Sequence, residues 1–306
     1  MSKIVVIGDS MLDEYIYGNT DRKNPESPMP LLNVEKEEIK LWWASNVANN
    51  IASLNWEVSL ISMIWKDPNG ELFSEMCKNA GITLIPLLMT APTITKKRFL
   101  DSQYKQQLLR VDYEQKEKIS EENIHNIERL LDELKPEYIV ISDYNKWIVT
   151  EKMMEIVKDY TKNNWVRILA DIKPQNLELF KWIFLIKSNF SEFHKMIGIQ
   201  WVENNNENIE KYWIEFVKQY NINLVVTRWW KWSTLITIDW GVIHIPAEER
   251  KVFDVTWAWD TYIATLTYAL SKWDELNDAV RLANTASGIV VWKVWTACVT
   301  REELWI

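Results

Sequence analysis

The chain has 306 residues and a net charge of −8; 47% of its residues are hydrophobic and 25% are charged. This balance is typical of a globular protein and excludes collagen-like and disordered chains, and the acidic charge gives no general attraction to nucleic acid or anionic membranes. Two cysteines, Cys77 and Cys298, are too few for a disulfide framework, which favours the cytoplasm, and no apolar stretch reaches the roughly 20 residues needed to span a membrane.

Tryptophan and glycine occur in unusual numbers. The chain has 19 tryptophans but only 7 glycines, although glycine alone makes up about 7% of an average protein. Together the two residue types reach an ordinary total. This suggests that tryptophan stands at many positions where glycine is expected.

The N-terminal region predicts strands and helices in alternation. Residues 4–7 are a β-branched run that ends at Gly8-Asp9-Ser10, which predicts a buried strand with polar groups at its carboxyl end. Apolar residues on one face predict a helix at 44–54, and a second strand is expected at 58–63. A helix near 70–80 follows.

The same alternation continues through the middle of the chain. Helices are expected near 121–134, 150–162 and 207–219, and strands at 138–141, 167–170, 183–186 and 223–227. Strands that alternate with helices predict an α/β fold with a mostly parallel central sheet flanked by helices. We expect one domain over residues 1–306.

Two segments, about 14–40 and 93–113, interrupt this alternation. The first contains three prolines between short extended runs, and the second contains two expected strands, 94–100 and 107–112, around a polar turn. A small β-sheet outside the main sheet explains both segments. It would form a lid or a dimer contact, or else a plain pair of surface hairpins, and the pattern favours neither.

Several tryptophans stand at positions that suit glycine. Residues 234–245 predict a hairpin with Trp240-Gly241 at its tip, where two-residue turns require a positive φ. Trp147, Trp165 and Trp273 each follow polar residues at an expected helix end or turn, and Trp56 precedes a strand.

The segment from Asp254 to Asp260 carries the clearest chemical signal. It precedes an apolar helix at 261–270, so Asp260 is expected in the first helical turn beside free backbone N–H groups. A carboxylate there can take a proton from a hydroxyl while the N–H groups stabilise a transferred phosphoryl group. Taken alone, the pattern favours a simple helix cap, which is the commoner case.

Four segments together resemble the signatures of the ribokinase-like (PfkB) sugar kinases. With glycine read at Trp257 and Trp259, residues 254–260 resemble the C-terminal signature, and residues 41–49 resemble the N-terminal one with Trp42 and Trp43 at its glycine positions. Residues 187–192 match the Asn-x-x-Glu element, and residues 226–233 resemble the loop after the nucleotide-side strand. The four occur in the family's order.

The N-terminal half resembles one branch of this family, the heptose 7-phosphate kinases of the ADP-heptose pathway. The similar segments are 8–15, 24–30, 93–98 and 106–112. In that branch the kinase is often joined to a nucleotidyltransferase, which would here be absent or on another polypeptide. The resemblance implies a ribokinase-like fold with a small β-sheet lid and a homodimer formed through that lid.

The resemblance also implies roles for individual residues. Asp260 would be the catalytic base, and the N–H groups of Trp257, Ala258 and Trp259 an anion hole. Residues implied to contact the sugar are Asp13, Asn46, Trp42 and Trp43. Residues implied on the nucleotide side are Asn189, Glu192, Thr227 and Asn284, with Glu192 acting on Mg²⁺ through water. Candidates for the phosphate already on the sugar, or else solvated lid charges, are Lys97, Arg98 and Arg110.

The implied function is ATP-dependent phosphorylation of the anomeric hydroxyl of a heptose 7-phosphate, with ATP and Mg²⁺ required. The alternatives are a related PfkB kinase for another sugar or sugar phosphate, and a catalytically inactive sugar- or nucleotide-binding protein. The tryptophans bear on this choice. Either they stand where the active protein has glycine, or the chain is genuinely rich in tryptophan and inactive.

Overall fold

The computed structural model describes residues 3–21, 25–26, 29–115, 117–199, 203–228, 233–246, 258–272, 274–291, 293 and 298–306. The strands of its larger sheet are β1 (Ile4–Gly8), β4 (Val58–Ile64), β5 (Thr83–Leu88), β8 (Tyr138–Ser142), β9 (Arg167–Asp171), β10 (Leu185–Asn189), β11 (Asn223–Thr227), β12 (Ser233–Ile236) and β13 (Val242–Ile245). Their order is β13-β12-β11-β10-β9-β8-β1-β4-β5. The pairs β11–β12 and β12–β13 are antiparallel and the other pairs are parallel.

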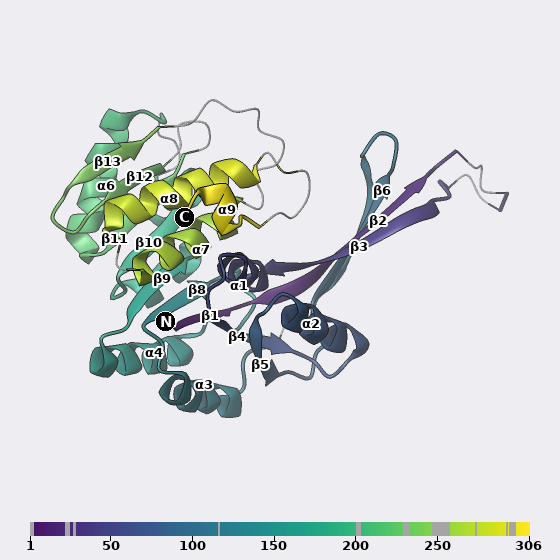
Figure 1. Ribbon diagram of the computed structural model, residues 1–306, viewed down its shortest axis with the longest axis horizontal. Coiled ribbons are helices and arrows are strands. Elements are labelled where there is room, and N and C mark those ends of the chain that lie inside the picture. The colour runs from purple at the N-terminus through teal and green to yellow at the C-terminus, as the bar shows by residue number, and fades with distance from the viewer. Residues whose placement is uncertain are drawn as a thin grey trace.

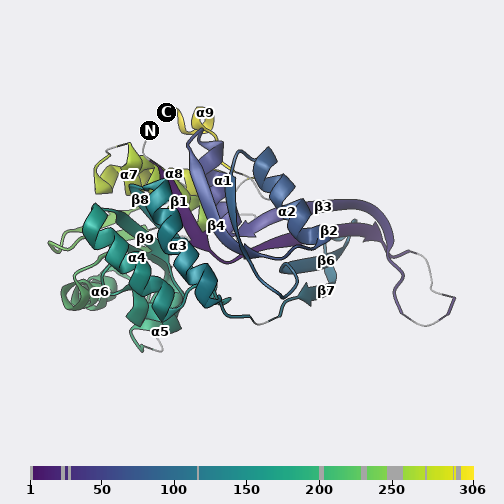
Figure 2. The same ribbon diagram turned by 90° about the horizontal axis from the view of Figure 1, so that it is seen from below.

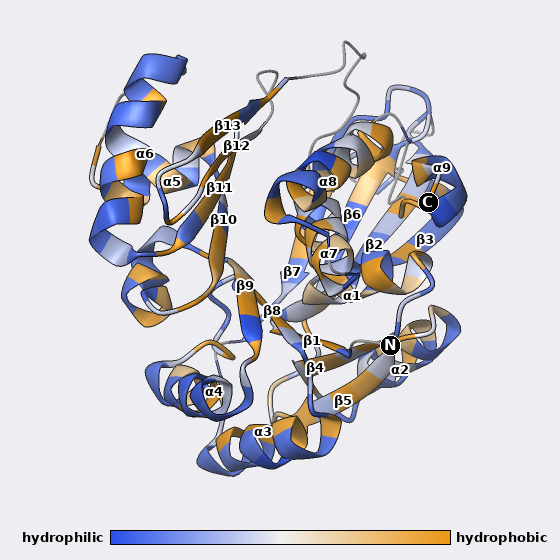
Figure 3. Cartoon of the chain, turned by 60° about the vertical axis from the view of Figure 1, so that its left-hand side comes forward, coloured by the Kyte–Doolittle hydropathy of each residue, from blue (hydrophilic) through white to orange (hydrophobic). Residues whose placement is uncertain are grey.

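Helices pack on both faces of this sheet. They are α1 (Ala44–Ser53), α2 (Pro68–Asn79), α3 (Glu121–Leu134), α4 (Glu151–Asn164), the 3₁₀ helix η1 (Pro174–Phe180), α5 (Phe190–Met196), α6 (Asn206–Tyr220), α7 (Ala258–Ser271), α8 (Leu276–Val290) and α9 (Arg301–Leu304). Side chains alternate across a strand, so Val5 and Ile7 join a core with α3, α4 and α6, while Ile4 and Val6 join another with α1, α2, α7 and α8. Figure 3 shows mostly hydrophobic strands between helices that carry both hydrophobic and hydrophilic residues.

The predicted alternation of strands and helices is confirmed, and each predicted element begins and ends close to its expected residues. The sequence patterns did not predict β5, α5, α8, α9 or the 3₁₀ helix. Within the described residues, no helix combines the length and hydrophobicity needed to cross a membrane.

A second sheet extends away from the main body (Figures 1 and 2). It consists of β2 (Ser10–Asn19), β3 (Asn33–Trp43), β6 (Thr95–Asp101) and β7 (Gln107–Tyr113), in the order β3-β2-β6-β7. The two strands predicted at 94–100 and 107–112 are therefore confirmed. Because β2 begins two residues after β1 and β3 runs directly into α1, the base of this sheet lies against the carboxyl edge of the larger one. We call this sheet the lid.

Tryptophan takes backbone conformations that glycine usually takes. Among the described residues, the tryptophans with positive φ are Trp43 (63°), Trp147 (92°), Trp165 (55°), Trp240 (72°) and Trp305 (58°). The turn-type conformations predicted for Trp147, Trp165 and Trp240 are confirmed, and Trp273 lies outside the described residues. At the remaining predicted position, Asn55 rather than Trp56 has the positive φ.

The hairpin of β12 and β13 differs from its prediction in one respect. Strand β12 ends at Ile236 and β13 begins at Val242, so the connection is longer than a two-residue turn. Thr237 N–H donates to the Gly241 carbonyl and Trp240 N–H donates to the Thr237 carbonyl. These hydrogen bonds close the loop and place Trp240, in place of Gly241, in the left-handed region.

Trp165 provides a direct test of whether such positions suit glycine. It ends α4 with φ 55° and ψ 34°, and its side chain is 94% exposed, so the indole contributes little packing. Trp165→Gly is expected to raise the free energy of unfolding by about 1 kcal/mol, because glycine adopts this conformation without the steric cost of a side chain. Chemical denaturation measures the change. Trp213→Gly, at a buried helical position, is the control and should lower stability by at least about 3 kcal/mol; a loss at Trp165 would contradict the prediction.

Candidate active site

Polar side chains gather where the central parallel strands end. Asp9 and Asp143 directly follow β1 and β8, and Asp171, Asn189 and Thr227 are the last residues of β9, β10 and β11. The carboxyl edge of a parallel sheet is the usual place for a ligand site in such folds. The polar end predicted for the first strand is part of this edge.

Asp260 lies in the first turn of α7 and is 2% exposed. Its Oδ2 accepts a hydrogen bond from Asn46 Nδ2 at 2.9 Å, and its Oδ1 accepts one from the Tyr144 hydroxyl at 3.1 Å. The structure therefore brings together Asp260 and Asn46, two predicted site residues that are 214 positions apart in the sequence. A second contact, from Thr261 Oγ1 to Asn50 Oδ1 at 2.9 Å, joins the same two helices.

The groups around Asp260 determine the pKa of its carboxyl group. Burial raises its pKa to about 7; the hydrogen bond from Asn46 opposes this rise, the nearby Asp171 carboxylate adds to it, and Lys187 and Tyr144 lower the pKa. Lys187 is 1% exposed and pairs with Asp171 at 2.5 Å. A carboxylate with a pKa near neutral pH can accept a proton and release it again, which is the property of a general base.

The predicted anion hole is described in part. Ala258 and Trp259 begin α7, whose first N–H groups have no partner within the helix. The Ala258 carbonyl accepts a hydrogen bond from Ser287 Oγ at 2.9 Å, and Lys187 Nζ lies 5.3 Å from the Trp259 ring. Trp257 lies outside the described residues.

Asp13 lies on β2 with its side chain fully buried. Arg98 Nε donates to Asp13 Oδ1 at 2.8 Å, and Asp13 is in register with Lys40 of β3 and Lys96 of β6. Burial raises the pKa of Asp13, while hydrogen bonds from Tyr15 and Arg98 lower it. Asp13 therefore lies among cationic side chains on one face of the lid.

The lid cations divide between its two faces because side chains alternate along a strand. Lys96 and Arg98 share a face with Asp13 and with Arg110, which is in register with Arg98. Lys97 points to the other face, where its Nζ lies 2.7 Å from Glu14. Of the three predicted phosphate ligands, the structure thus places Arg98 and Arg110 together and Lys97 apart from them.

Two tryptophans contact the lid cations. Trp43, with φ 63° and ψ −130°, precedes α1, and its indole stacks on the Tyr144 ring at 4.9 Å between centroids. Lys96 Nζ lies 5.1 Å from the Trp43 ring, and the Arg98 guanidinium lies 5.5 Å from the Trp42 ring. Trp43 is therefore linked through Tyr144 to Asp260, and Trp42 through Arg98 to Asp13.

Two of the predicted nucleotide-side residues, Asn189 and Thr227, lie at the ends of the neighbouring strands β10 and β11. Asn189 is in register with Thr227, and Thr227 with Ser233. Ser233 Oγ donates to Asn284 Oδ1 of α8 at 3.1 Å. Asn189, Thr227 and Asn284 are thus brought together around Ser233, which the sequence patterns did not single out as a ligand. The adjoining loop at 229–232 lies outside the described residues.

Glu192 is held at the N-terminus of α5. Asn189 caps this helix by accepting from Glu192 N–H at 2.9 Å, and Asn189 Nδ2 donates to Glu192 Oε2 at 2.5 Å. Lys173 Nζ contacts Glu192 Oε1 at 2.5 Å. Among the described residues there is no cluster of three or more potential metal ligands. Among these residues, Glu192 is thus a single carboxylate rather than part of a ligand cluster. This fits Mg²⁺, which usually keeps several waters and binds protein through one or two carboxylates together with substrate phosphates.

Tertiary contacts add residues to which the motifs gave no role: Tyr144, Lys40, Lys96, Asp171 and Lys187. One local signal was present for Tyr144, because Asp143-Tyr144 directly follows a buried strand, where ligand-binding side chains gather. No local signal distinguishes Lys96 from its neighbour Lys97, since only strand pairing decides which of them faces Asp13.

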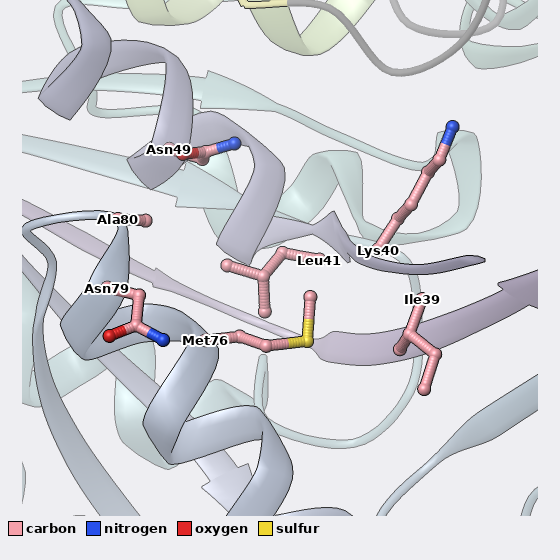
Figure 4. Close-up of a pocket in the computed structure, with 7 residues that line it drawn as sticks. All are labelled: Ile39, Lys40, Leu41, Asn49, Met76, Asn79 and Ala80. Atoms are coloured by element: carbon pink, nitrogen blue, oxygen red, sulfur yellow. The ribbon is translucent and has the colours of Figure 1, made fainter. Parts of the chain in front are cut away.

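A pocket of about 370 Å³ lies elsewhere, between β3, α1 and α2 (Figure 4). Its lining residues are Ile39, Lys40, Leu41, Asn49, Met76, Asn79 and Ala80. None of the predicted site residues lines it. The predicted site residues gather instead at the carboxyl edge around Asp260, and this edge is therefore the candidate active site.

Comparison with known proteins shows which family the chain belongs to. A family model described as pfkB family carbohydrate kinase matches residues 1–299. Two curated proteins named bifunctional protein HldE are similar: that of a Nitratiruptor species is 33% identical over 305 residues, and that of Pseudomonas paraeruginosa is 36% identical over 303. They match 99% and 98% of this chain but only 64% and 62% of their own lengths, so the chain spans less than two thirds of these relatives.

Solved structures confirm the predicted ribokinase-like α/β fold. Phosphofructokinase-2 from Escherichia coli in complex with potassium superimposes with a TM-score of 0.84 at 15% identity, over 100% of this chain and 97% of that one. Ribokinase from Arabidopsis thaliana complexed with ribose and ATP gives 0.75 at 16% identity, over 99% and 97%. The family match, the relatives and the fold agree: the chain belongs to the pfkB family of carbohydrate kinases.

Proposed function

We propose that the protein transfers the γ-phosphoryl group of ATP to the anomeric hydroxyl of a heptose 7-phosphate, with Asp260 as the general base. The observation that carries this proposal is a buried carboxylate in the first turn of α7, with both oxygens held by hydrogen bonds and a pKa near 7. The similarity to bifunctional proteins named HldE supports the choice of a heptose phosphate.

The proposed step is a direct displacement at phosphorus. The anomeric hydroxyl gives its proton to the Asp260 carboxylate while its oxygen bonds to the γ-phosphorus, and the bond from that phosphorus to the bridging oxygen breaks to release ADP. The N–H groups at the start of α7, those of Ala258 and Trp259 included, stabilise the negative charge on the transferred group. Asp260 then returns the proton to solvent.

The lid supports a substrate that already carries a phosphate. Four cationic side chains, those of Lys40, Lys96, Arg98 and Arg110, lie on the face of the lid that carries Asp13. Arginine and lysine are the usual ligands of phosphate oxygens. We assign the sugar phosphate to this face, and sugar hydroxyls to Asp13 and Asn46.

ATP is assigned to the edge formed by Asn189, Thr227 and Asn284. Mg²⁺ bound with its phosphates would neutralise part of their charge, and Glu192 would reach the ion through water. Lys173 and Asn189 hold the Glu192 carboxylate in place for this role. Because ATP is the donor, we place the reaction in the cytoplasm. Homodimerisation through the lid, and a nucleotidyltransferase as a partner domain or chain, are parts of the same proposal.

A specific observation favours a second candidate, a sugar- or nucleotide-binding protein without catalysis. The Trp43 indole lies between Tyr144, which contacts the proposed base, and Lys96, which is assigned to the substrate phosphate. If tryptophan is the native residue, it stands in the path between these two groups. A kinase for another sugar phosphate would use the same Asp260 and differ at the lid.

Turnover of ATP against a panel of sugars tests the proposal. We expect kcat/KM with heptose 7-phosphate to exceed that with unphosphorylated heptose by about 10²-fold or more, because the free sugar forms no charge-assisted contacts with the lid. Hexose and pentose phosphates form the rest of the panel. Equal kcat/KM with free heptose would contradict the assignment of the lid cations, and binding of sugar phosphate and ATP without any turnover would favour the binding protein.

A further inference from the structure

Tyr144 and Asn46 contact different oxygens of the proposed base. The Tyr144 hydroxyl donates to Asp260 Oδ1 at 3.1 Å, while Asn46 Nδ2 donates to Oδ2 at 2.9 Å. A carboxylate has about four lone-pair sites, so each oxygen keeps one for a substrate hydroxyl. Two donors on different oxygens also oppose rotation of the carboxylate about its Cβ–Cγ bond.

The Tyr144 ring is itself held from two sides. It stacks on Trp43 at 4.9 Å, and Lys173 Nζ lies 5.1 Å from its centroid. Lys173 also pairs with Glu192, so Tyr144 lies between the proposed base and the proposed nucleotide-side carboxylate. Burial and the nearby Asp260, Asp171 and Glu192 carboxylates raise the pKa of Tyr144 well above its usual value. The hydroxyl therefore stays protonated, and it remains a donor across the working pH range.

We propose that Tyr144 is a positioning residue for Asp260, whose hydroxyl orients the carboxylate and favours its ionised form. This inference rests on the proposed function, in which Asp260 is the base. The charged groups that face Asp260 from the other elements are Asp171 of β9 and Lys187 of β10. These two form an ion pair, which leaves the hydrogen bonds from Asn46 and Tyr144 as the direct contacts to the carboxylate among the described residues.

The test is Tyr144→Phe, which keeps the ring and removes only the hydroxyl. A lost hydrogen bond to the charged form raises the pKa of a carboxyl group. We expect the pKa of Asp260 to rise by about one unit or more, so that kcat/KM falls most at acidic pH and recovers as the pH rises. The control is Tyr138→Phe, which removes a buried hydroxyl that donates to the Leu270 carbonyl at 2.8 Å instead.

Two measurements separate this inference from the proposed function. The first is a ¹³C NMR titration of the Asp260 carboxyl carbon in aspartate-labelled protein, assigned by its absence from Asp260→Asn, and it requires no activity. The second is the pH dependence of kcat/KM for the sugar phosphate, which reports the pKa values of the free enzyme. The inference is supported if the NMR pKa and the pKa of the acidic limb of kcat/KM both rise in Tyr144→Phe but not in Tyr138→Phe.

Three outcomes would overturn the inference. An unchanged Asp260 pKa in Tyr144→Phe overturns the positioning role, whatever the activity. A raised NMR pKa with an unchanged acidic limb of kcat/KM overturns Asp260 as the base, and with it any catalytic role of Tyr144. Equal shifts in both phenylalanine variants would show a general response to a lost buried hydroxyl, and would also overturn the inference.

Discussion

Asparagine at position 260 is expected to lower kcat by about 10²–10⁴-fold, the usual contribution of a general base. The amide keeps the size of the carboxyl group and still accepts the hydrogen bond from Tyr144 or Asn46, but it cannot take a proton from the sugar hydroxyl. ATP turnover measures the loss, and binding of ATP and sugar phosphate should persist because the ligand-binding residues are untouched.

Asp278→Asn is the matched control for this change. Asp278 also lies in the first turn of a helix, the neighbouring α8, but it is more accessible to solvent than Asp260. If Asp260 only caps α7, both variants will lower stability slightly and leave kcat unchanged. Normal turnover by Asp260→Asn would therefore rule out the proposed mechanism.

Asp260→Asn is expected to lower activity but to raise stability. The pKa of Asp260 is about 7 in the folded protein against an ordinary value of 3.8, so between about pH 4 and pH 7 the folded state holds a proton that the unfolded state has released. Stability therefore falls as the pH rises through this window. Asp260→Asn removes this loss, and we expect its Tm to exceed that of the parent at pH 8, with the difference shrinking toward pH 4. A constant difference would contradict the raised pKa.

Glycine at position 43 is expected to raise kcat/KM by at least about 10²-fold, the effect of restoring substrate alignment. The Trp43 indole is buried between Tyr144, Lys96 and Lys146, in the space that separates the proposed base from the lid cations. The substitution opens this space for the sugar. It also relieves a backbone conformation that glycine adopts readily, φ 63° and ψ −130°.

Trp165→Gly is the control for this gain. It makes the same exchange at another positive-φ tryptophan and should stabilise the protein without changing kcat/KM. An inactive Trp43→Gly protein that still binds sugar phosphate would contradict the prediction and favour the binding protein. The intact mass of the protein from its natural host decides between the two explanations of the tryptophans, since each glycine in place of tryptophan lowers it by a fixed amount.

Much of the architecture was predictable because its signals are local. The β-branched run at 4–7, the alternating helices and strands, and the apolar helix after Asp260 each follow from residues that are near one another in the chain. Asp260 and Asn46 were both predicted as site residues, from two separate motifs. Only the tertiary structure shows that they form a hydrogen bond, since they lie 214 positions apart in the sequence.

Strand pairing determines which side chains of the lid lie beside Asp13. A shift of one residue moves a side chain to the other face of a sheet, so local pattern does not tell whether Lys96 or Lys97 lies beside Asp13. The register of β2 with β6 places Lys96 and Arg98 there and pairs Lys97 with Glu14. Tyr144 was likewise unassigned, because its role depends on the place of α7 over the sheet.

By itself, the sequence determined the α/β fold, the family motifs and the excess of tryptophan over glycine, because these depend on residue types and their spacing. Only the tertiary structure decided which side chains meet at Asp260 and which face the lid turns toward it, because those depend on packing between distant segments. It also showed that Trp43, Trp147, Trp165, Trp240 and Trp305 have positive φ. Backbone conformation at these residues is the physical reason to expect glycine there.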